Sequence, residues 1–399
     1  MTKNTSKKTF YFLFSVAILL TKFASMGDFA IYPVTNQFYE LFPGKDSIVN
    51  YIISGPQLII TAMAFLVPLL ATRLSKKKLI VLSVILFGIG SALSVVILNE
   101  YVIAFGRTLV GVGQGILAVV TITIIGDVFS DEEQQARYVG IYNAGGNAAA
   151  MLLSLGAGAL AAYGWDRPFL LYLIAVPMLL AAIFFIPEQE PTRNDSKGQA
   201  KSGIGSFCTE FWVMAIAGAV FSMLRTIIMY YMSSFTAENS LGDSGVAALA
   251  ASLAQLFAFV GAMSFSVVYS KIRRWIMPLA CGIMAAALTL WCTTASEVTV
   301  FAVYCMACGS SGLFMAYIYA HAMTIVDNAS ANTAIGVLSA VCGIAAFVPT
   351  YFVTFLMKVL GADTVSAVLF VPMLIGLALF AVCLLYTIHL HTREGSKKI

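Results

Sequence analysis

The chain has 399 residues, of which 60% are hydrophobic and only 11% are charged, and its formal net charge is +4. Soluble domains carry about a quarter charged residues, and the mean hydropathy of +0.90 also departs from that class. This composition excludes an ordinary soluble enzyme, a disordered chain and a disulfide-stapled secreted domain. We therefore expect a membrane protein.

Apolar runs long enough to cross a bilayer recur along the whole chain. A spanning helix needs about 20 mostly apolar residues, and internal Gly or Pro does not exclude one. Twelve such runs predict an all-α membrane protein with twelve transmembrane helices. The runs cover residues 10–34, 48–71, 79–98, 101–126, 137–162, 168–186, 211–235, 245–269, 275–294, 298–325, 333–357 and 365–388.

The first run, 10–34, contains two ionisable residues, Lys22 and Asp28. Its length and the spans that follow favour a retained helix over a cleaved leader. In a continuous helix, Lys22 and Asp28 would lie about 9 Å apart along the axis and about 120° apart around it. They are therefore not expected to pair tightly with each other.

The fourth run, 101–126, contains the sequence Arg107-Thr-Leu-Val-Gly111-Val-Gly113-Gln-Gly115 and is followed by Asp127. The glycines are not a nucleotide-binding fingerprint, because no strand precedes them. Small residues at such spacing allow close contact between helices. Arg107 joins the small set of charges that are predicted within the bilayer.

A polar stretch separates the sixth and seventh runs. Residues 187–206 are rich in Pro, Gly, Ser and charge, which is typical of a linker. We predict an N-terminal six-helix bundle at 1–186, a cytoplasmic linker at 187–208 and a C-terminal six-helix bundle at 209–399.

The second half contributes one more buried cation and one titratable imidazole. Arg225 lies in the seventh run, and His321 lies in the tenth. A charge at mid-bilayer costs a few kcal/mol, so such residues are expected to face a partner or a wet cavity. Snorkelling to the interface is the alternative for a cation near a helix end. Tyrosines flank both sites: Tyr230, Tyr231, Tyr317 and Tyr319.

Basic residues indicate the orientation of the spans. With both termini in the cytoplasm, 17 of the 23 Lys and Arg fall on the cytoplasmic side, three on the outer side and three inside spans. This asymmetry favours an even number of spans across the cell membrane, with both termini on the cytoplasmic side. The positive charge then faces anionic lipid and does not indicate nucleic-acid binding.

Several features repeat at an offset close to 200 residues, which indicates two copies of one six-span unit. Parallel repeats of this kind are a transporter design with a solute site between the copies. The matching features are the basic loops 73–78 and 271–274, the acids Asp127 and Asp327, and the segments 164–166 and 361–363.

With these features together, the sequence resembles the major facilitator superfamily. The Arg107-to-Gly115 stretch is similar to the pattern of its fourth span, and Gly126-Asp127 is similar to the acidic exit from that span. Gly164-Trp165-Asp-Arg-Pro-Phe169 and Ile186-Pro187-Glu188 resemble two later signatures. The loop motif of the family maps onto 68–77, where Arg73, Lys76 and Lys77 fit, but Thr72 replaces the acid.

The resemblance implies a secondary transporter in which spans one and seven line a central cavity. Lys22 and Arg225 would then approach a solute from opposite halves, a layout similar to that of organic-anion transporters in the family. Three cations against one acid favour an anionic or amphipathic substrate. The candidate substrate-binding residues are Lys22, Arg225, Arg107, Tyr230, Tyr231 and Tyr317.

Other interpretations stay open. Asp28 can neutralise Arg107 or Lys22, and an apolar pocket would then suit multidrug efflux by drug–proton antiport. A solute sensor that transports nothing is a further alternative. Asp28 and His321 are the candidate proton carriers, and Arg73, Lys76, Lys77 and Asp127 are the candidate gating residues.

We expect no enzymatic activity, because no Walker loop, HExxH or GxSxG motif is present. We also expect no cofactor and no metal, and we interpret Cys305-x-x-Cys308 as helix packing, because no second pair accompanies it. The expected partners are a small solute, protons and membrane lipid, and we expect a monomer.

Overall fold

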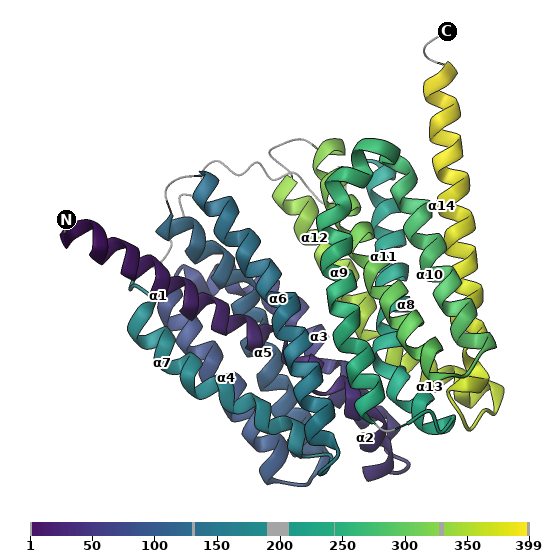
Figure 1. Ribbon diagram of the computed structural model, residues 1–399, viewed down its shortest axis with the longest axis horizontal. Coiled ribbons are helices and arrows are strands. Elements are labelled where there is room, and N and C mark those ends of the chain that lie inside the picture. The colour runs from purple at the N-terminus through teal and green to yellow at the C-terminus, as the bar shows by residue number, and fades with distance from the viewer. Residues whose placement is uncertain (1, 130–131, 190–206, 243, 327–330, 397–399) are drawn as a thin grey trace. The chain divides into compact units, whose positions relative to one another are not determined.

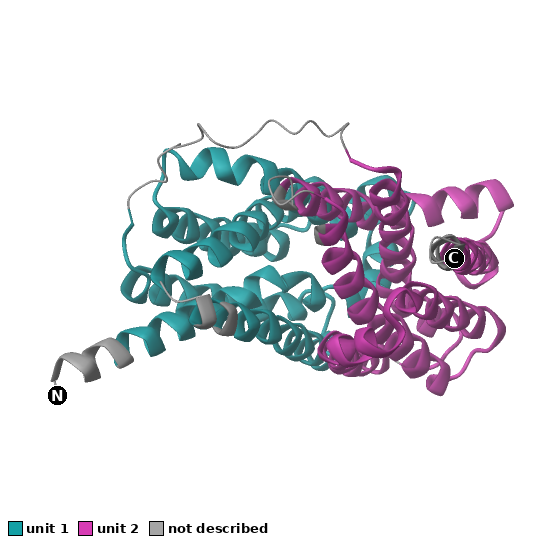
Figure 2. Cartoon of the chain, turned by 90° about the horizontal axis from the view of Figure 1, so that it is seen from above, with its two compact units in different colours: residues 1–198 teal, residues 199–399 magenta. Residues whose placement is uncertain are grey.

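The computed structural model describes residues 2–129, 132–189, 207–242, 244–326 and 331–396. Within these ranges every regular element is a helix (Figure 1). The chain divides into two compact units, residues 1–198 and 199–399 (Figure 2). Most of the predicted linker, residues 190–206, lies outside the described residues, and so does Asp327.

The first unit contains seven α-helices among its described residues, with short 3₁₀ segments between them. The α-helices are α1 (Thr2–Ser25), α2 (Thr35–Leu41), α3 (Asp46–Ala71), α4 (Lys76–Val96), α5 (Glu100–Val128), α6 (Glu132–Ala161) and α7 (Ala175–Phe185). The 3₁₀ segments are η1 (Gly27–Ala30), η2 (Tyr32–Val34) and η3 (Arg167–Ile174).

The second unit has a similar composition of elements. Its α-helices are α8 (Thr209–Glu238), α9 (Ser244–Ile272), α10 (Ile276–Thr293), α11 (Glu297–Ile325), α12 (Ala331–Phe347), α13 (Pro349–Leu360) and α14 (Phe370–Ser396). Two short 3₁₀ turns, η5 (Arg273–Trp275) and η6 (Ser366–Val368), precede α10 and α14.

The two units pair their helices in the same way. In the first unit α5 packs along α3 and α4, α4 contacts α7, and α1 contacts α6. In the second unit α11 packs along α9 and α10, α10 contacts α14, and α8 contacts α12. The two units therefore share the same pattern of helix neighbours, in agreement with the repeat seen in the sequence.

Ten described segments are long and apolar enough to cross a membrane, or eleven if α1 and the bent helical segment after it form one span. One of the ten, Gly245–Thr293, runs through α9, η5 and α10. The sequence divides this segment into two spans, so the total of twelve stays a prediction.

Two predicted helices are broken. The first run was expected to be continuous over 10–34, but α1 ends at Ser25 and the chain bends by 56° before it continues over Gly27–Leu41. The run at 333–357 is divided between α12 and α13, with Pro349 at the first position of α13. Val348, the residue before Pro349, keeps helical backbone angles. The missing N–H of Pro349 and the crowding of its ring against the carbonyl four residues earlier account for the second break.

The glycines of α5 allow two neighbouring helices to approach closely. A Cβ atom at Gly113 would lie 2.5 Å from the Ser83 carbonyl oxygen of α4, and one at Gly115 would lie 2.5 Å from Met63 Cβ of α3. Gly111 likewise meets Pro56 of α3. The packing role that the sequence predicts for these glycines therefore operates on two faces of α5.

Candidate functional site

A buried ion pair lies where α1 breaks. Arg107 of α5 has no exposed surface, and its Nη2 donates to Asp28 Oδ1 of η1 at 2.6 Å. Asp28 is 9% exposed. Of the alternatives that the sequence leaves open, the structure therefore has Asp28 neutralising Arg107, and the enclosed guanidinium has no surface for a solute in this conformation.

Arg107 also satisfies a backbone carbonyl that α3 cannot satisfy itself. Pro56 has no N–H, so the carbonyl of Ile52, four residues earlier, lacks its helical donor. Arg107 Nε donates to that oxygen at 2.9 Å. One side chain thus joins the broken α1, the proline-containing α3 and its own helix.

The break itself is held by two further side chains. Gln114 Nε2 of α5 donates to the Ala24 carbonyl at 3.0 Å, and the Tyr172 hydroxyl of η3 donates to the Gly27 carbonyl at 2.9 Å. Both oxygens lie next to the point where helical hydrogen bonding stops, so they need donors from elsewhere. The bend between α1 and η1 is therefore stabilised by specific hydrogen bonds from α5 and η3.

Lys22 lies in the last turn of α1 and is half-buried. Its Nζ sits 3.9 Å from the centroid of the Tyr142 ring of α6. Among the described residues, no carboxylate lies within ion-pair distance of Lys22. Of the two cations that the sequence places within spans of the first unit, Arg107 is thus paired with a carboxylate and Lys22 is not.

In the second unit, Arg225 is half-buried within α8 and interacts with the Cys308 thiol of α11. The described residues place no carboxylate within ion-pair distance of it either. Tyr230 and Tyr231 of the same helix are each only 3% exposed, and the Tyr231 hydroxyl donates to the Thr350 carbonyl at 3.1 Å. In this conformation these two tyrosines are therefore packing residues.

His321 has a partner that the sequence did not suggest. Its Nε2 lies 2.9 Å from Glu210 Oε1, in the first turn of α8. The imidazole stacks on Tyr317, with ring centroids 5.4 Å apart, and Tyr317 is itself 3% exposed. Glu210 follows the polar linker, where an acid is ordinary, and this is why sequence reasoning missed it.

Charged side chains also gather at the end of α5 that carries Asp127. Lys76, at the start of α4, forms an ion pair with Asp127. The neighbouring Ser75 donates to Glu188 Oε1 at 2.7 Å. Two of the four candidate gating residues, Lys76 and Asp127, are thus brought together, whereas Arg73 is exposed and Lys77 is half-exposed.

The opposite end of α5 carries a second ion pair, between Glu100 in its first turn and Lys45. Lys45 lies in the loop before α3. The hydrogen bond to Glu100 raises the pKa of the Lys45 ammonium above its ordinary value. Both ends of α5 are therefore anchored to neighbouring segments by charge.

A sequence model of the family described as Major Facilitator Superfamily matches residues 17–350. The chain belongs to the major facilitator superfamily. Membership makes it a multi-pass membrane transporter of a small-molecule solute and not an enzyme. A search of curated protein sequences found no significant match.

Solved transporter structures share the major facilitator fold with this chain. A bacterial homologue of the human lysosomal transporter Spinster, inward-facing and unoccupied, matches with a TM-score of 0.79 at 14% identity over 95% of this chain and 97% of that one. The nucleoside transporter NupG gives 0.76 at 11% identity, covering 93% and 99%. The POT family transporter PepTSo gives 0.73 at 11%, covering 95% and 98%. At these identities the likeness shows the fold.

Within this major facilitator chain, the described residues contain no group of three or more His, Cys, Asp or Glu that could hold a metal ion. Cys308 of the Cys305-x-x-Cys308 segment is buried and Cys305 is partly buried, both on α11. The charged groups that the sequence singles out within the spans thus form two ion pairs, at Asp28 and His321, and two cations without a carboxylate partner among the described residues, Lys22 and Arg225.

Proposed function

We propose that this protein is a secondary active transporter of the cell membrane that moves a small organic anion by alternating access of its two halves, residues 1–186 and 209–399. The observation that carries the proposal is the contrast among three cations. Arg107 is neutralised by Asp28, whereas Lys22 and Arg225, one in each unit, have no carboxylate partner among the described residues.

An unneutralised cation within a bilayer span is costly, and a carboxylate, sulfonate or phosphate offsets that cost through charge-assisted hydrogen bonds. One cation in each half also gives a solute a contact with both moving parts. An anionic substrate that binds both Lys22 and Arg225 then stabilises the conformations in which both side chains can contact it. Tyr319, which is partly exposed, is a candidate wall with a polar tip. Tyr317, like Tyr230 and Tyr231, is buried and would contact a solute only in a conformation that exposes it.

We further propose that transport is coupled to protons through Asp28 or His321. Each lies in an ion pair whose strength changes when a proton is gained or lost. Protonation of Asp28 weakens its bond to Arg107, and deprotonation of His321 weakens its bond to Glu210. Coupling needs a group whose charge state alters local contacts. Lys76 and Asp127, with Arg73 and Lys77, are proposed to control closure at the cytoplasmic end.

A charge series on one ring skeleton tests the substrate class. The thermal stability of the purified protein is measured at pH 6 and pH 8 with benzoate, benzenesulfonate, phenyl phosphate, benzyl alcohol and benzylammonium. Because a ligand that binds the native state raises its melting temperature, stabilisation by the anions alone supports the proposal. Stabilisation by benzylammonium alone would favour multidrug efflux by drug–proton antiport.

The proton coupling has a separate test in proteoliposomes. Asp28→Asn should abolish accumulation driven by an inward pH gradient while it leaves exchange between equal solute pools intact, and His321→Gln is compared in parallel. If neither variant changes gradient-driven accumulation of an anion that the wild type transports, these two residues do not carry the proton. Binding without any exchange would indicate a solute sensor.

A further inference from the structure

The Lys22 side chain is held by groups that stabilise its charge without cancelling it. Lys22 lies in the last turn of α1, and the Met26 N–H donates to the Lys22 carbonyl at 2.9 Å just before the helix gives way to η1. The carbonyl end of a helix favours a positive charge. The face of the Tyr142 ring, 3.9 Å from Nζ, favours it as well.

Neither of these partners carries a formal negative charge. Arg107 in the same unit shows the alternative, because Asp28 neutralises it at 2.6 Å. A carboxylate beside Lys22 would compete with an anionic solute for the ammonium, whereas an aromatic ring leaves the charge available.

Helix α6 is shaped to keep the ammonium on that ring. A Cβ atom at Gly146, one turn after Tyr142, would lie 2.7 Å from Lys22 Cε, so a side chain there would push the outer part of the lysine side chain out of its present position. The neighbouring Gly145 leaves room for Leu19 in the same way, with 2.7 Å to its Cδ2. The lysine stem is therefore confined between α1 and α6.

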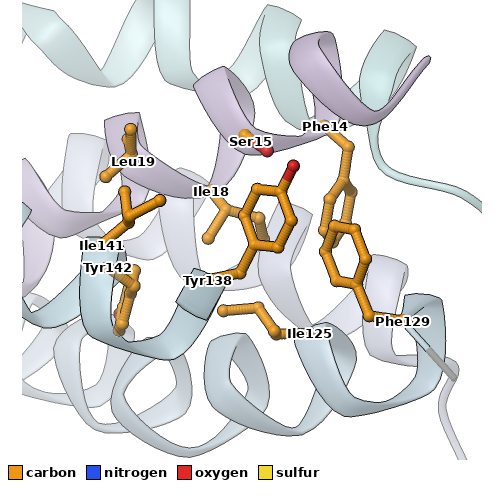
Figure 3. A pocket seen from close by; sticks show the side chains of 9 residues that line it. All are labelled: Phe14, Ser15, Ile18, Leu19, Ile125, Phe129, Tyr138, Ile141 and Tyr142. Carbon is orange, nitrogen blue, oxygen red and sulfur yellow. The ribbon is translucent and has the colours of Figure 1, made fainter. Parts of the chain in front are cut away.

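Tyr142 is itself enclosed. It is 1% exposed, and its hydroxyl lies near those of Thr21, Ser25 and Thr121, although it makes no hydrogen bond of normal geometry among the described residues. Figure 3 shows the side chain on α6, next to Ile141, among the residues that line a small gap, with Phe14 and Tyr138 also lining it. The gap has a volume of about 10 Å³. A gap of that size holds no more than about one water molecule, so the ring has little room to turn away.

We propose that Tyr142 is a positioning residue that presents the charged Lys22 ammonium to an anionic substrate, and that Gly146 provides the clearance this arrangement requires. The inference rests on the proposed role of Lys22 and adds a determinant of affinity and charge selectivity that does not touch the substrate itself.

The test varies the ring electronics at nearly constant shape. Tyr142 is replaced by Phe and then by mono-, di- and trifluorinated Phe, and the dissociation constant of benzoate is measured for each variant. A cation–π contact predicts that Phe binds within about twofold of wild type and that affinity falls stepwise with each fluorine. Loss of the ring in Tyr142→Leu should weaken binding by about 2- to 30-fold.

Matched controls on α6 separate this effect from packing. Gly146→Ala should weaken benzoate binding, whereas Gly140→Ala should not, because a Cβ atom at Gly140 meets nothing within 4 Å. Tyr138 lies one turn before Tyr142 on α6, and its ring stacks on Phe129. Tyr138→Leu should therefore leave the affinity for benzoate unchanged. If Tyr142→Leu does not fold, the benzoate affinities of the fluorinated Phe variants still test the cation–π contact.

The outcomes distinguish this inference from the proposed function. Equal benzoate affinity across the fluorinated series, with a large loss in Lys22→Ala, would overturn the role of Tyr142 and leave the anion site intact. Unchanged benzoate affinity in Lys22→Ala would overturn both. A stepwise loss in the series together with a loss in Lys22→Ala supports both.

Discussion

Arg107 combines two tasks at the level of a single side chain. It neutralises Asp28 and it supplies the donor that Pro56 denies to the Ile52 carbonyl. Removing one partner of a buried ion pair costs about 3–5 kcal/mol, and an unsatisfied buried carbonyl adds about 1–3 kcal/mol. Arg107 is therefore expected to be a main determinant of stability in the first unit.

This dual role predicts a specific rescue. Arg107→Ala should lower the free energy of unfolding by at least about 3 kcal/mol. Adding Pro56→Ala should recover about 1 kcal/mol of it, because the new N–H at position 56 can bond the Ile52 carbonyl. Unfolding of the four proteins of this double-mutant cycle in mixed detergent measures the coupling. The same effect of Pro56→Ala in both backgrounds would contradict the role of the carbonyl.

The sequence predicts which residues are charged within the spans, but it does not predict which of them pair. Composition and spacing identify Lys22, Asp28, Arg107 and Arg225 as unusual, because charge within an apolar run is costly. The sequence does not select which cation Asp28 meets, since Asp28 and Arg107 are 79 residues apart. That choice depends on how α1 bends.

At the scale of elements, the bend in α1 is the least predictable feature of the fold. Its run is apolar through 10–34, and a glycine such as Gly27 is ordinary in a membrane helix. The break is stabilised by Gln114 and Tyr172, which supply donors to the Ala24 and Gly27 carbonyls. The break at Pro349 has a local cause, the missing N–H of the proline, but Pro56 and Pro68 lie within α3 without ending it, so a proline alone does not predict where a helix breaks.

Gly27 should be intolerant of a side chain. A Cβ atom there would meet Phe87 at 2.9 Å and Tyr172 at 3.0 Å, both within buried packing. Gly27→Ala should therefore lower the melting temperature of the purified protein, by an amount that corresponds to about 1–3 kcal/mol. Gly126→Ala on α5 is the control, since nothing lies within 4 Å of its Cβ atom. Equal melting temperatures for the two variants would show that the bend is not tightly packed.

The ion pair between α4 and α5 should act on the transport cycle more than on stability. Asp127 is 42% exposed at its side chain, and exposed pairs contribute about 0–1 kcal/mol. Lys76→Asp and Asp127→Lys should each slow solute exchange, and the charge-swapped double variant should recover much of it. Exchange rates in proteoliposomes measure this, and a double variant as slow as the worse single one would show that the pair is not what matters.

At the scale of the whole molecule, the sequence predicts the fold class well and the site only in part. Apolar runs and a repeat near 200 residues predict a helical membrane protein of two similar halves, because only helices and closed barrels span a bilayer. The major facilitator fold is implied by the motif resemblance, above all by the Arg107-to-Gly115 stretch. Matching pairs such as α3 with α5 and α9 with α11 express that repeat. The partners Tyr142 and Glu210 could not be predicted, since each is an ordinary residue in its local sequence.

The central claim is that Lys22 and Arg225 provide the positive charge that binds an anionic solute. Counterflow of radiolabelled benzoate into proteoliposomes tests it most directly, in wild type, Lys22→Ala, Arg225→Ala and the control Lys271→Ala, whose lysine is exposed at the end of α9. We expect that loss of either of these two cations lowers counterflow at least about tenfold, while Lys271→Ala leaves it unchanged. Counterflow that persists at the wild-type rate in Lys22→Ala and Arg225→Ala would contradict the claim.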